Sequence, residues 1–340
     1  IGPALRSMAG ATGFKLEGET MRTSYRIAMA VVGCLTFAPG AQADFNDKKP
    51  INITATGIST RSIFKGIMEV MHGLYRQHYP GTDQKADIAM AVPPVELRNG
   101  INGDAPFPKS IKGKVMHAFT IMDNLDFFFI AQKDWSEKNG IKTIADIGTK
   151  KPKMTLGLSR RGTYYSNTAA AQVFAANGFK IADVKKWGGD IAYSNTRNGI
   201  KDMTDGKIDF MFQGTIQPDP RIKRLAAARG IVWISANADT LKKVAKELGF
   251  HYVTTPKTYY PFMTKAEPSM RVDIYTMAGA HVSAETVYKM VKAIGENIDK
   301  IRAVHAAFRG FSLKQMAQKS ALVEYHPGAA RYYREKGLIK

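Results

Sequence analysis

An α/β fold with two lobes around a central cleft is predicted by three features of the sequence. Apolar, β-branched runs alternate with amphipathic segments after Asp44. Such alternation is typical of mostly parallel sheets that carry helices on both faces. The elements fall into two series that meet near residues 142–147, and a chain of 340 residues suits two domains of ordinary size.

The first 43 residues are set aside from this fold. Residues 21–43 contain a short basic start, an apolar stretch at 27–38, and the small-x-small site Ala41-Gln42-Ala43. This order is typical of a secretory signal peptide. Residues 1–20 precede that start and are interpreted as a tag or an upstream extension. We therefore expect export to the periplasm and a mature chain that begins near Asp44.

The first series is assigned to lobe 1, over residues 44–135. A β-rich run at 51–56 leads into a segment whose apolar residues share one helical face. Further strands are expected at 86–92, 115–122 and 127–132.

The second series, over residues 136–253, is assigned to lobe 2. It is expected to contain, in order, a helix at 142–147, strand 154–158, helix 163–177, strand 184–187, helix 195–203, strand 208–212, helix 220–228, strand 231–234, helix 240–248 and strand 252–254. The chain then returns to lobe 1 over residues 254–340, with a strand at 272–277 and helices at 284–308 and 329–336. Crossover segments near 131–134 and 254–256 are expected to hinge the lobes.

Composition argues against several classes of function. The net charge of +20 comes from basic residues scattered along the chain, without a basic helix or an aromatic-basic strand, so we do not expect a nucleic-acid partner. The single cysteine, Cys34, falls in the signal segment, and the seven histidines are dispersed, so we expect no metal site. No nucleophile elbow, phosphate loop or dinucleotide fingerprint is present, and we expect neither a catalytic residue nor a cofactor.

The turn at residues 159–163 is the strongest candidate for binding an anion. It joins an expected strand to an expected helix, whose first backbone N–H groups and dipole favour a carboxylate. Gly162 permits close backbone approach, Thr163 can cap the helix, and Arg160 or Arg161 can pair with a carboxylate in a bidentate manner. Ser159 ends the strand. The alternative is an ordinary helix cap flanked by solvated arginines.

Other candidate ligand-binding residues stand in similar positions. Those in the first lobe follow the first strand, those in the second follow the strand at 208–212, and one tyrosine could form a wall of the cleft. They are Gly57, Ser59, Thr60, Arg61, Gln213, Thr215 and Tyr259. A helix cap, a turn or simple packing is the competing explanation for each of them.

Five segments of the mature chain stand in the order and spacing of a known family. They are Ile53-Thr54-Ala55-Thr56-Gly57, Ile144-Ala145-Asp146-Ile147-Gly148, Arg161-Gly162-Thr163, residues 203–210 and residues 326–338. Together they resemble the TAXI family, the solute-binding subunits of one class of tripartite ATP-independent periplasmic (TRAP) transporter. The resemblance implies a type II periplasmic-binding-protein fold, two lobes joined by crossover strands, and delivery of glutamate or another carboxylate to a membrane permease.

The resemblance is imperfect at three loops, 57–64, 90–94 and 160–163, which would face the ligand. The usual ligand of the family is therefore not assumed. Two other classes remain open: a binding protein of the same fold that serves an ABC transporter, and an enzyme built on a similar clamp.

Overall fold

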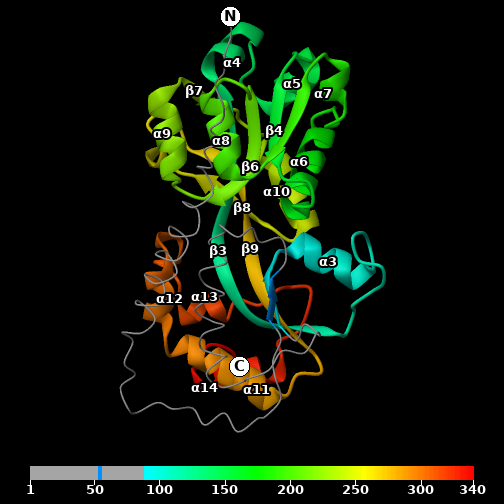
Figure 1. Ribbon diagram of the computed structural model, residues 1–340, viewed down its shortest axis with the longest axis vertical. Helices are drawn as coiled ribbons and strands as arrows, with labels where there is room; N and C mark the ends of the chain where they lie inside the picture. Colours follow the sequence, from blue (N-terminus) through cyan, green and yellow to red (C-terminus); the bar gives the residue numbers. More distant parts are fainter. Residues whose placement is uncertain (1–52, 56–87) are drawn as a thin grey trace, which may run out of the picture. The chain divides into compact units, whose positions relative to one another are not determined.

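The computed structural model describes residues 53–55, for which only the backbone is considered, and residues 88–340 (Figure 1). The chain divides into two units, residues 1–44 and 45–340, and every described residue belongs to the second. The expected signal peptide and the candidates Gly57, Ser59, Thr60 and Arg61 lie outside the described residues.

The described strands form one sheet of mixed direction. Its order is β1-β2-β9-β3-β6-β4-β5, with β7 paired to β3 and β8 paired to β9. Three of the pairings are parallel and five are antiparallel. The α/β class is thus confirmed, but the pairing is mixed rather than mostly parallel. The reason is that β3 and β9 run in opposite directions between the lobes and pair with each other.

The strand β3, Val115–Gln132, is the longest element of the sheet. The sequence predicted two strands here, because Asp123, Asn124 and Asp126 interrupt the apolar pattern. The strand continues because polar partners exist across it: the guanidinium of Arg271 on β9 binds both oxygens of Asp126, at 2.6 and 2.9 Å. A buried carboxylate with a bidentate arginine is compatible with a central strand.

The two lobes meet within β3 and β9, Glu267–Gly279 (Figure 1). Of the described strands, the first half of β3 pairs with β9 alone, which also carries β2, whereas the second half, from Leu125, pairs with β6 on its other side. The register of β3 on β9 shifts between His117 and Leu125. The crossing therefore lies before the boundary expected at residue 135. Lobe 2 also extends past residue 253, because β8 pairs with the lobe 2 half of β9.

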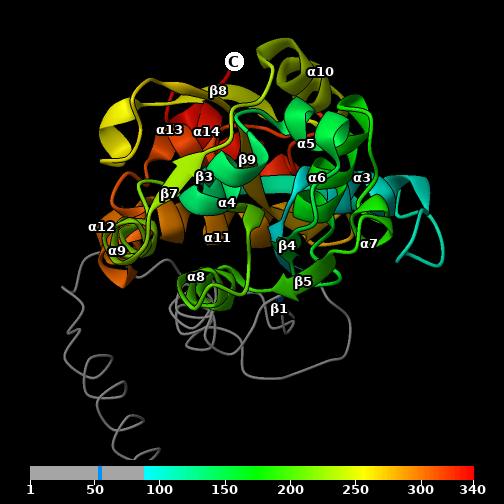
Figure 2. The same ribbon diagram turned by 90° about the horizontal axis from the view of Figure 1, so that it is seen from above.

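In lobe 2 the neighbouring strands β5, β4 and β6 are parallel, β8 pairs antiparallel with β9, and helices cover both faces of the sheet (Figures 1 and 2). Helices α6 and α10 pack together on one face, and α8 and α9 pack together on the other. The elements of this lobe are α4 (Lys133–Asn139), α5 (Ile144–Lys150), β4 (Thr155–Ser159), α6 (Tyr164–Ala176), α7 (Asp183–Lys186), β5 (Asp190–Ser194), α8 (Thr196–Thr204), β6 (Phe210–Ile216), α9 (Pro220–Ala228), β7 (Ile231–Trp233), α10 (Ala238–Leu248), β8 (His251–Thr255) and the 3-10 turn η1 (Lys257–Tyr259).

The strand expected at 184–187 is wrong. These residues form the short helix α7, in which Asp183 pairs with Lys186 one turn later and accepts a hydrogen bond from the backbone of Lys180. Val184 is buried, and its β-branched apolar side chain led to the prediction of a strand at this position. The true strand, β5, begins at Asp190 and pairs in register with β4.

Lobe 1 contains the remaining described elements. They are β1 (Ile53–Ala55), β2 (Ile88–Val92), α3 (Pro94–Asn102), α11 (Ala284–Gly295), α12 (Ile298–Val304), the 3-10 turn η2 (Ala306–Phe308), α13 (Leu313–Met316) and α14 (Pro327–Glu335). The single helix expected at 284–308 is divided, because the side chain of Asn297 donates to the carbonyl of Ala293 and ends α11. No helix among residues 53–55 and 88–340 is long and apolar enough to cross a membrane.

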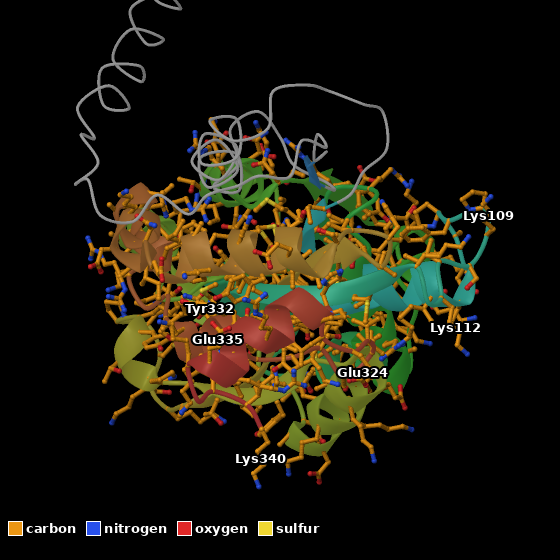
Figure 3. All side chains as sticks on the ribbon, turned by 90° about the horizontal axis from the view of Figure 1, so that it is seen from below. Lys109, Lys112, Glu324, Tyr332, Glu335 and Lys340 are labelled. Carbon is orange, nitrogen blue, oxygen red and sulfur yellow. The ribbon has the colours of Figure 1, made fainter. Side chains whose placement is uncertain are left out.

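The C-terminal helix α14 packs on α11 (Figure 3). Gly295 permits this approach, since a Cβ there would lie 2.4 Å from the hydroxyl of Tyr332. His326 caps α14 with its Nδ1, which accepts from the Gly328 N–H, and its Nε2 lies 3.1 Å from the carbonyl oxygen of Val282. His326 therefore orders the start of the C-terminal helix.

Candidate ligand-binding cleft

A cleft of about 1650 Å³ lies between the two lobes and is lined by residues from both. Lobe 1 contributes mainly apolar side chains from β2, α3, β3 and β9, together with Glu96 and Arg309. Lobe 2 contributes three turns that follow the carboxyl ends of β4, β5 and β6, which are parallel neighbours. This is the edge of a parallel sheet at which ligands bind in α/β proteins.

The first of these turns, between β4 and α6, differs from the expected anion site. Arg160 lines the cleft but is exposed, whereas Arg161 turns away and stacks on the ring of Tyr193, 4.1 Å from its centroid. The side chain of Thr163 makes no capping hydrogen bond, so the predicted cap is wrong. Ser159 is buried and its hydroxyl donates to Ser166, at 2.8 Å.

The N-terminus of α6 is occupied instead by an acidic side chain from lobe 1. Glu96 lies in the first turn of α3, and its Oε1 accepts a hydrogen bond of 3.2 Å from the backbone N–H of Tyr165. The other oxygen, Oε2, is buried and has no hydrogen bond to a described residue. Burial raises the pKa of Glu96 to about 7, although the N–H of Tyr165 opposes this shift. The sequence analysis missed Glu96; a single acid in the first turn of α3, directly after an apolar run, was the available signal.

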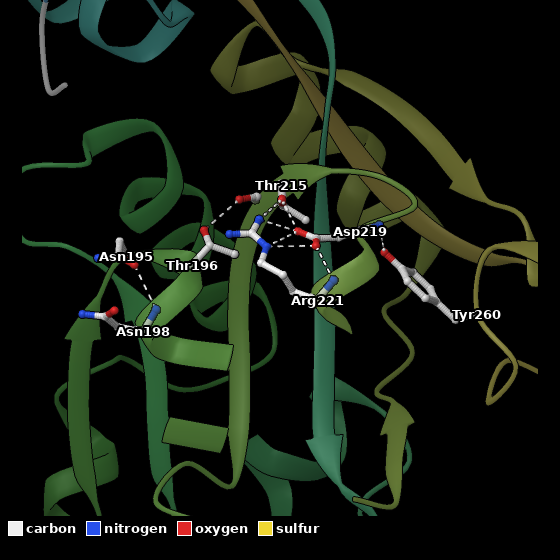
Figure 4. A network of polar contacts seen from close by, with 8 residues as sticks. Asn195, Thr196, Asn198, Thr215, Asp219, Arg221 and Tyr260 are labelled. Atoms are coloured by element: carbon white, nitrogen blue, oxygen red, sulfur yellow. Dashed lines mark hydrogen bonds and ion pairs between the residues drawn. The ribbon is translucent and has the colours of Figure 1, made fainter. Parts of the chain in front are cut away.

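Arg221, at the start of α9, is the cleft arginine with the most side-chain hydrogen bonds to described residues (Figure 4). Asp219 is buried, caps α9 through the backbone N–H of Arg221, and accepts a hydrogen bond of 2.7 Å from the hydroxyl of Thr215. The guanidinium of Arg221 donates to both oxygens of Asp219, and its Nη2 donates to Thr215. The Asp219 N–H donates to the hydroxyl of Tyr260. These contacts fix Arg221 in one orientation.

Arg221 remains accessible although its partner is not. Its side chain is 33% exposed, whereas that of Asp219 is 3% exposed. Its Nη1 has no hydrogen bond to a described residue, and the side chain lines the cleft. The sequence analysis assigned this segment to the start of an ordinary helix. The available signal was an acid, Asp219, two residues before Arg221 and shortly after the end of a strand.

The remaining predicted site residues are placed as follows. Gln213 is buried beneath the cleft, where its Nε2 donates to the carbonyl of Leu158, and it does not line the cleft. Thr215 lines the cleft, but its hydroxyl already donates a hydrogen bond to Asp219 and accepts one from Arg221. Tyr259 lines a separate, smaller pocket of about 430 Å³ beside η1. Gly162 lines the cleft and has a φ of +89°, which favours glycine.

The charges that line the cleft favour an anion. Among the described residues they comprise five arginines and two acids, namely Arg160, Arg197, Arg221, Arg224, Arg309, Glu96 and Asp219. Of the arginines, only Arg221 forms an ion pair with a described residue. A cleft with walls of one predominant sign concentrates ligands of the opposite sign. No group of three or more His, Cys, Asp or Glu within residues 88–340 is arranged to hold a metal ion.

A family model described as the NMT1-like family matches residues 82–337. The chain belongs to the NMT1-like family. The matched segment of this NMT1-like chain contains all the described residues that line the cleft. No protein among the curated ones compared with the chain matches it.

Three solved structures illustrate what this NMT1-like chain is similar to. The binding protein component of an ABC phosphonate transporter from Pseudomonas aeruginosa is 13% identical, with a TM-score of 0.44 and coverage of 86% of this chain and 96% of that one. Iron-bound HitA from Pseudomonas aeruginosa is 12% identical, with a TM-score of 0.44 and coverage of 85% and 100%. The alkanesulfonate-binding protein SsuA from Xanthomonas axonopodis pv. citri bound to MOPS is 10% identical, with a TM-score of 0.38 and coverage of 86% and 94%. At these values the solved structures assign no ligand to this chain.

Proposed function

We propose that this protein is a periplasmic solute-binding protein that captures a small organic anion in the cleft and delivers it to a membrane transporter. The observation that carries the proposal is Arg221, an arginine pinned by the buried Asp219 at the edge of the cleft between two lobes. Arginine keeps its charge at any physiological pH and offers a planar fork of donors that matches a carboxylate.

The position of Arg221 supports binding of an anion in two ways. Its partner Asp219 holds the guanidinium in place, so less conformational entropy is lost when a ligand binds. Arg221 also lies in the first turn of α9, where the helix dipole favours negative charge. Arg160, Arg197 and Arg224 line the same wall and add a favourable potential.

The described residues of the cleft are suited to holding a ligand rather than to transforming one. His305 is the only histidine that lines the described part of the cleft, and its Nδ1 accepts from the Ala307 N–H at the start of η2. Asp219 has its oxygens occupied by Arg221 and Thr215. Neither side chain is paired with a nucleophile in the manner of a catalytic site. We therefore propose a binding function without catalysis.

The transporter that we propose is of the TRAP type, and the protein would be its TAXI-like subunit. Support comes from the resemblance of residues 203–210 and 326–338. An ABC transporter is the alternative partner for a protein of this architecture. Transport of the ligand by proteoliposomes that contain a candidate permease distinguishes the two: uptake driven by an ion gradient supports the TRAP class, and uptake that requires ATP supports the ABC class.

Export is proposed from the signal-like segment at residues 21–43. N-terminal sequencing of the protein from a periplasmic extract should give a start at or near Asp44. A start upstream of Met21 would contradict the proposal.

Binding itself is tested with purified protein. Ligand carried through purification is identified by mass spectrometry, and amino acids, keto acids and aromatic acids are then screened for an increase in melting temperature, which reports binding to the folded state. Arg221→Gln should abolish the increase, whereas Arg161→Gln, whose arginine stacks on Tyr193, should retain it. If the two variants bind equally well, Arg221 is not the anchor.

Closure of the lobes on the ligand is expected, with bending where β3 and β9 cross between them. This replaces the hinge expected near residues 131–134 and 254–256, because both segments pair with strands of lobe 2. Small-angle scattering with and without the identified ligand should show a smaller radius of gyration in the bound form. An unchanged radius would count against closure.

A further inference from the structure

Glu96 differs from every other charged group that lines the described part of the cleft. Asp219 is neutralised by Arg221, and the arginines share one sign, but Glu96 is an acid without a cationic partner among the described residues. One of its oxygens is fixed by the Tyr165 N–H, and the other is buried without a hydrogen bond. A buried carboxylate oxygen that lacks a donor is costly, and native structures retain such groups mainly for a purpose.

Glu96 and Arg221 stand on opposite lobes and are connected through one side chain. Tyr165, whose N–H holds Glu96, packs beside Gly214, where a Cβ would lie 3.7 Å from the tyrosine Cε2. The next residue, Thr215, accepts a hydrogen bond of 3.1 Å from Arg221. All of these residues line the cleft. A small molecule held between the lobes can therefore meet an acid on one side and an arginine on the other.

We propose that Glu96 is a specificity-determining residue whose free oxygen binds a protonated amine of the ligand, while Arg221 binds the anionic group of the same molecule. The inference rests on the proposed function and narrows its substrate class to anions that carry an amine. An ammonium group supplies three donors and a positive charge, so it satisfies the unpartnered oxygen and the buried charge together. A carboxylate or an oxo acid without an amine would leave this oxygen without a donor and the charge of Glu96 without a counterion.

A purely structural role for Glu96 is the competing explanation, because α3 also joins the lobes through a second residue. Arg98, two positions later, donates to the carbonyl of Glu247 in the last turn of α10. Arg98 does not line the described cleft. Arg98→Gln therefore weakens the contact between α3 and lobe 2 without touching the ligand, and it is the matched control for Glu96→Gln. In Glu96→Gln, the side chain keeps an oxygen that can accept the hydrogen bond from the Tyr165 N–H.

The state of Glu96 before binding provides an independent readout. Burial raises its pKa to about 7, so that near this pH it is partly protonated. The titratable group that faces it from α6 is the phenol of Tyr165, whose own pKa is raised by burial and by the charge of Glu96. Arg98 of its own helix turns to Glu247. An ammonium beside Glu96 would favour the carboxylate form, so binding should release protons.

The test compares carboxylates with the same acids lacking the amine: phenylalanine with 3-phenylpropanoate, glutamate with glutarate, and 4-aminobutanoate with butanoate. Affinities are measured by calorimetry at pH 7 in two buffers of different ionisation enthalpy. In the parent protein, the amine-bearing member of at least one pair should bind at least tenfold more tightly and release protons. In Glu96→Gln, that preference should fall below threefold and the proton release should disappear, while Arg98→Gln keeps both.

Several outcomes would overturn the inference. Equal affinity for both members of every pair, or a preference that survives in Glu96→Gln, would exclude recognition of the amine while leaving anion binding by Arg221 intact. An equal loss of preference in Arg98→Gln would assign the effect to the docking of α3. If no probe binds, or if Arg221→Gln binds all of them like the parent, the proposed function fails together with the inference.

Discussion

The turns that lead into α6 and α9 follow neighbouring parallel strands, yet they present their arginines in opposite ways. Arg160 and Arg161 before α6 are exposed, and Arg161 stacks on the half-buried Tyr193. Arg221 in α9 is held by a buried carboxylate and a threonine. The N-terminus of α6 is contacted by Glu96 from the other lobe, whereas that of α9 is capped by Asp219 from its own turn. An arginine near a helix start becomes an anchor only where a buried partner fixes it.

The largest expected effect is the loss of ligand affinity in Arg221→Gln. Removing one partner of a desolvated, charged hydrogen bond costs about 2–5 kcal/mol. We expect the variant to bind the identified ligand at least thirtyfold more weakly by calorimetry, which corresponds to about 2 kcal/mol. A loss of similar size in Arg160→Gln, with Arg221→Gln unaffected, would reverse the comparison of the two turns.

The second effect concerns the dependence of stability on pH at the α6 turn. Because burial raises the pKa of Glu96 from 4.5 to about 7, the folded protein binds more protons than the unfolded chain between these values. Stability contributed by this group therefore falls as pH rises from 4.5 to 7, by up to about 3 kcal/mol. Glu96→Gln should remove that component from the urea unfolding free energy measured over this range. An unchanged pH profile in the variant would show that Glu96 titrates normally.

The third effect is the destabilisation caused by Asp219→Asn at the α9 turn. The substitution keeps a capping side chain but leaves Arg221 half-buried without its counterion. Since Arg221 is one-third exposed, we expect a loss of about 2 kcal/mol, discounted from the cost for a fully buried pair. Urea unfolding measures it, and the double variant Asp219→Asn with Arg221→Gln should recover part of the loss. Failure to recover would mean that the ion pair is not the cause.

The smallest effect is expected for the exposed arginines before α6. Arg160→Ala and Arg161→Ala should each change the free energy of unfolding by less than about 0.5 kcal/mol, as for ordinary surface positions. Arg160 lines the cleft, so its variant should slow ligand association at low salt, and this difference should vanish at high salt. Stopped-flow measurements at two ionic strengths test this. A large loss of affinity in Arg161→Ala would contradict the position of its side chain on Tyr193.

Much of the architecture was accessible to sequence patterns. The succession of strands and helices in lobe 2 follows local periodicity and caps, as in α8, which Asn195 caps, and α10, which Asn237 caps. The errors occurred where long-range partners override the local pattern. Asp126 remains within β3 because the guanidinium of Arg271 on β9 binds both of its carboxylate oxygens.

The sequence by itself determined the α/β class, most of the elements of lobe 2, and the edge of the sheet at which a ligand should bind, because these depend on periodicity and on the direction of neighbouring strands. Only the tertiary structure decided which side chains reach that edge. Glu96 and Tyr165 lie far apart along the chain but form a hydrogen bond. Arg161 turns away from the cleft because its guanidinium stacks on the ring of Tyr193 in β5. Arg221 is distinguished from the other arginines by the burial of Asp219, and burial is a property of the packed fold.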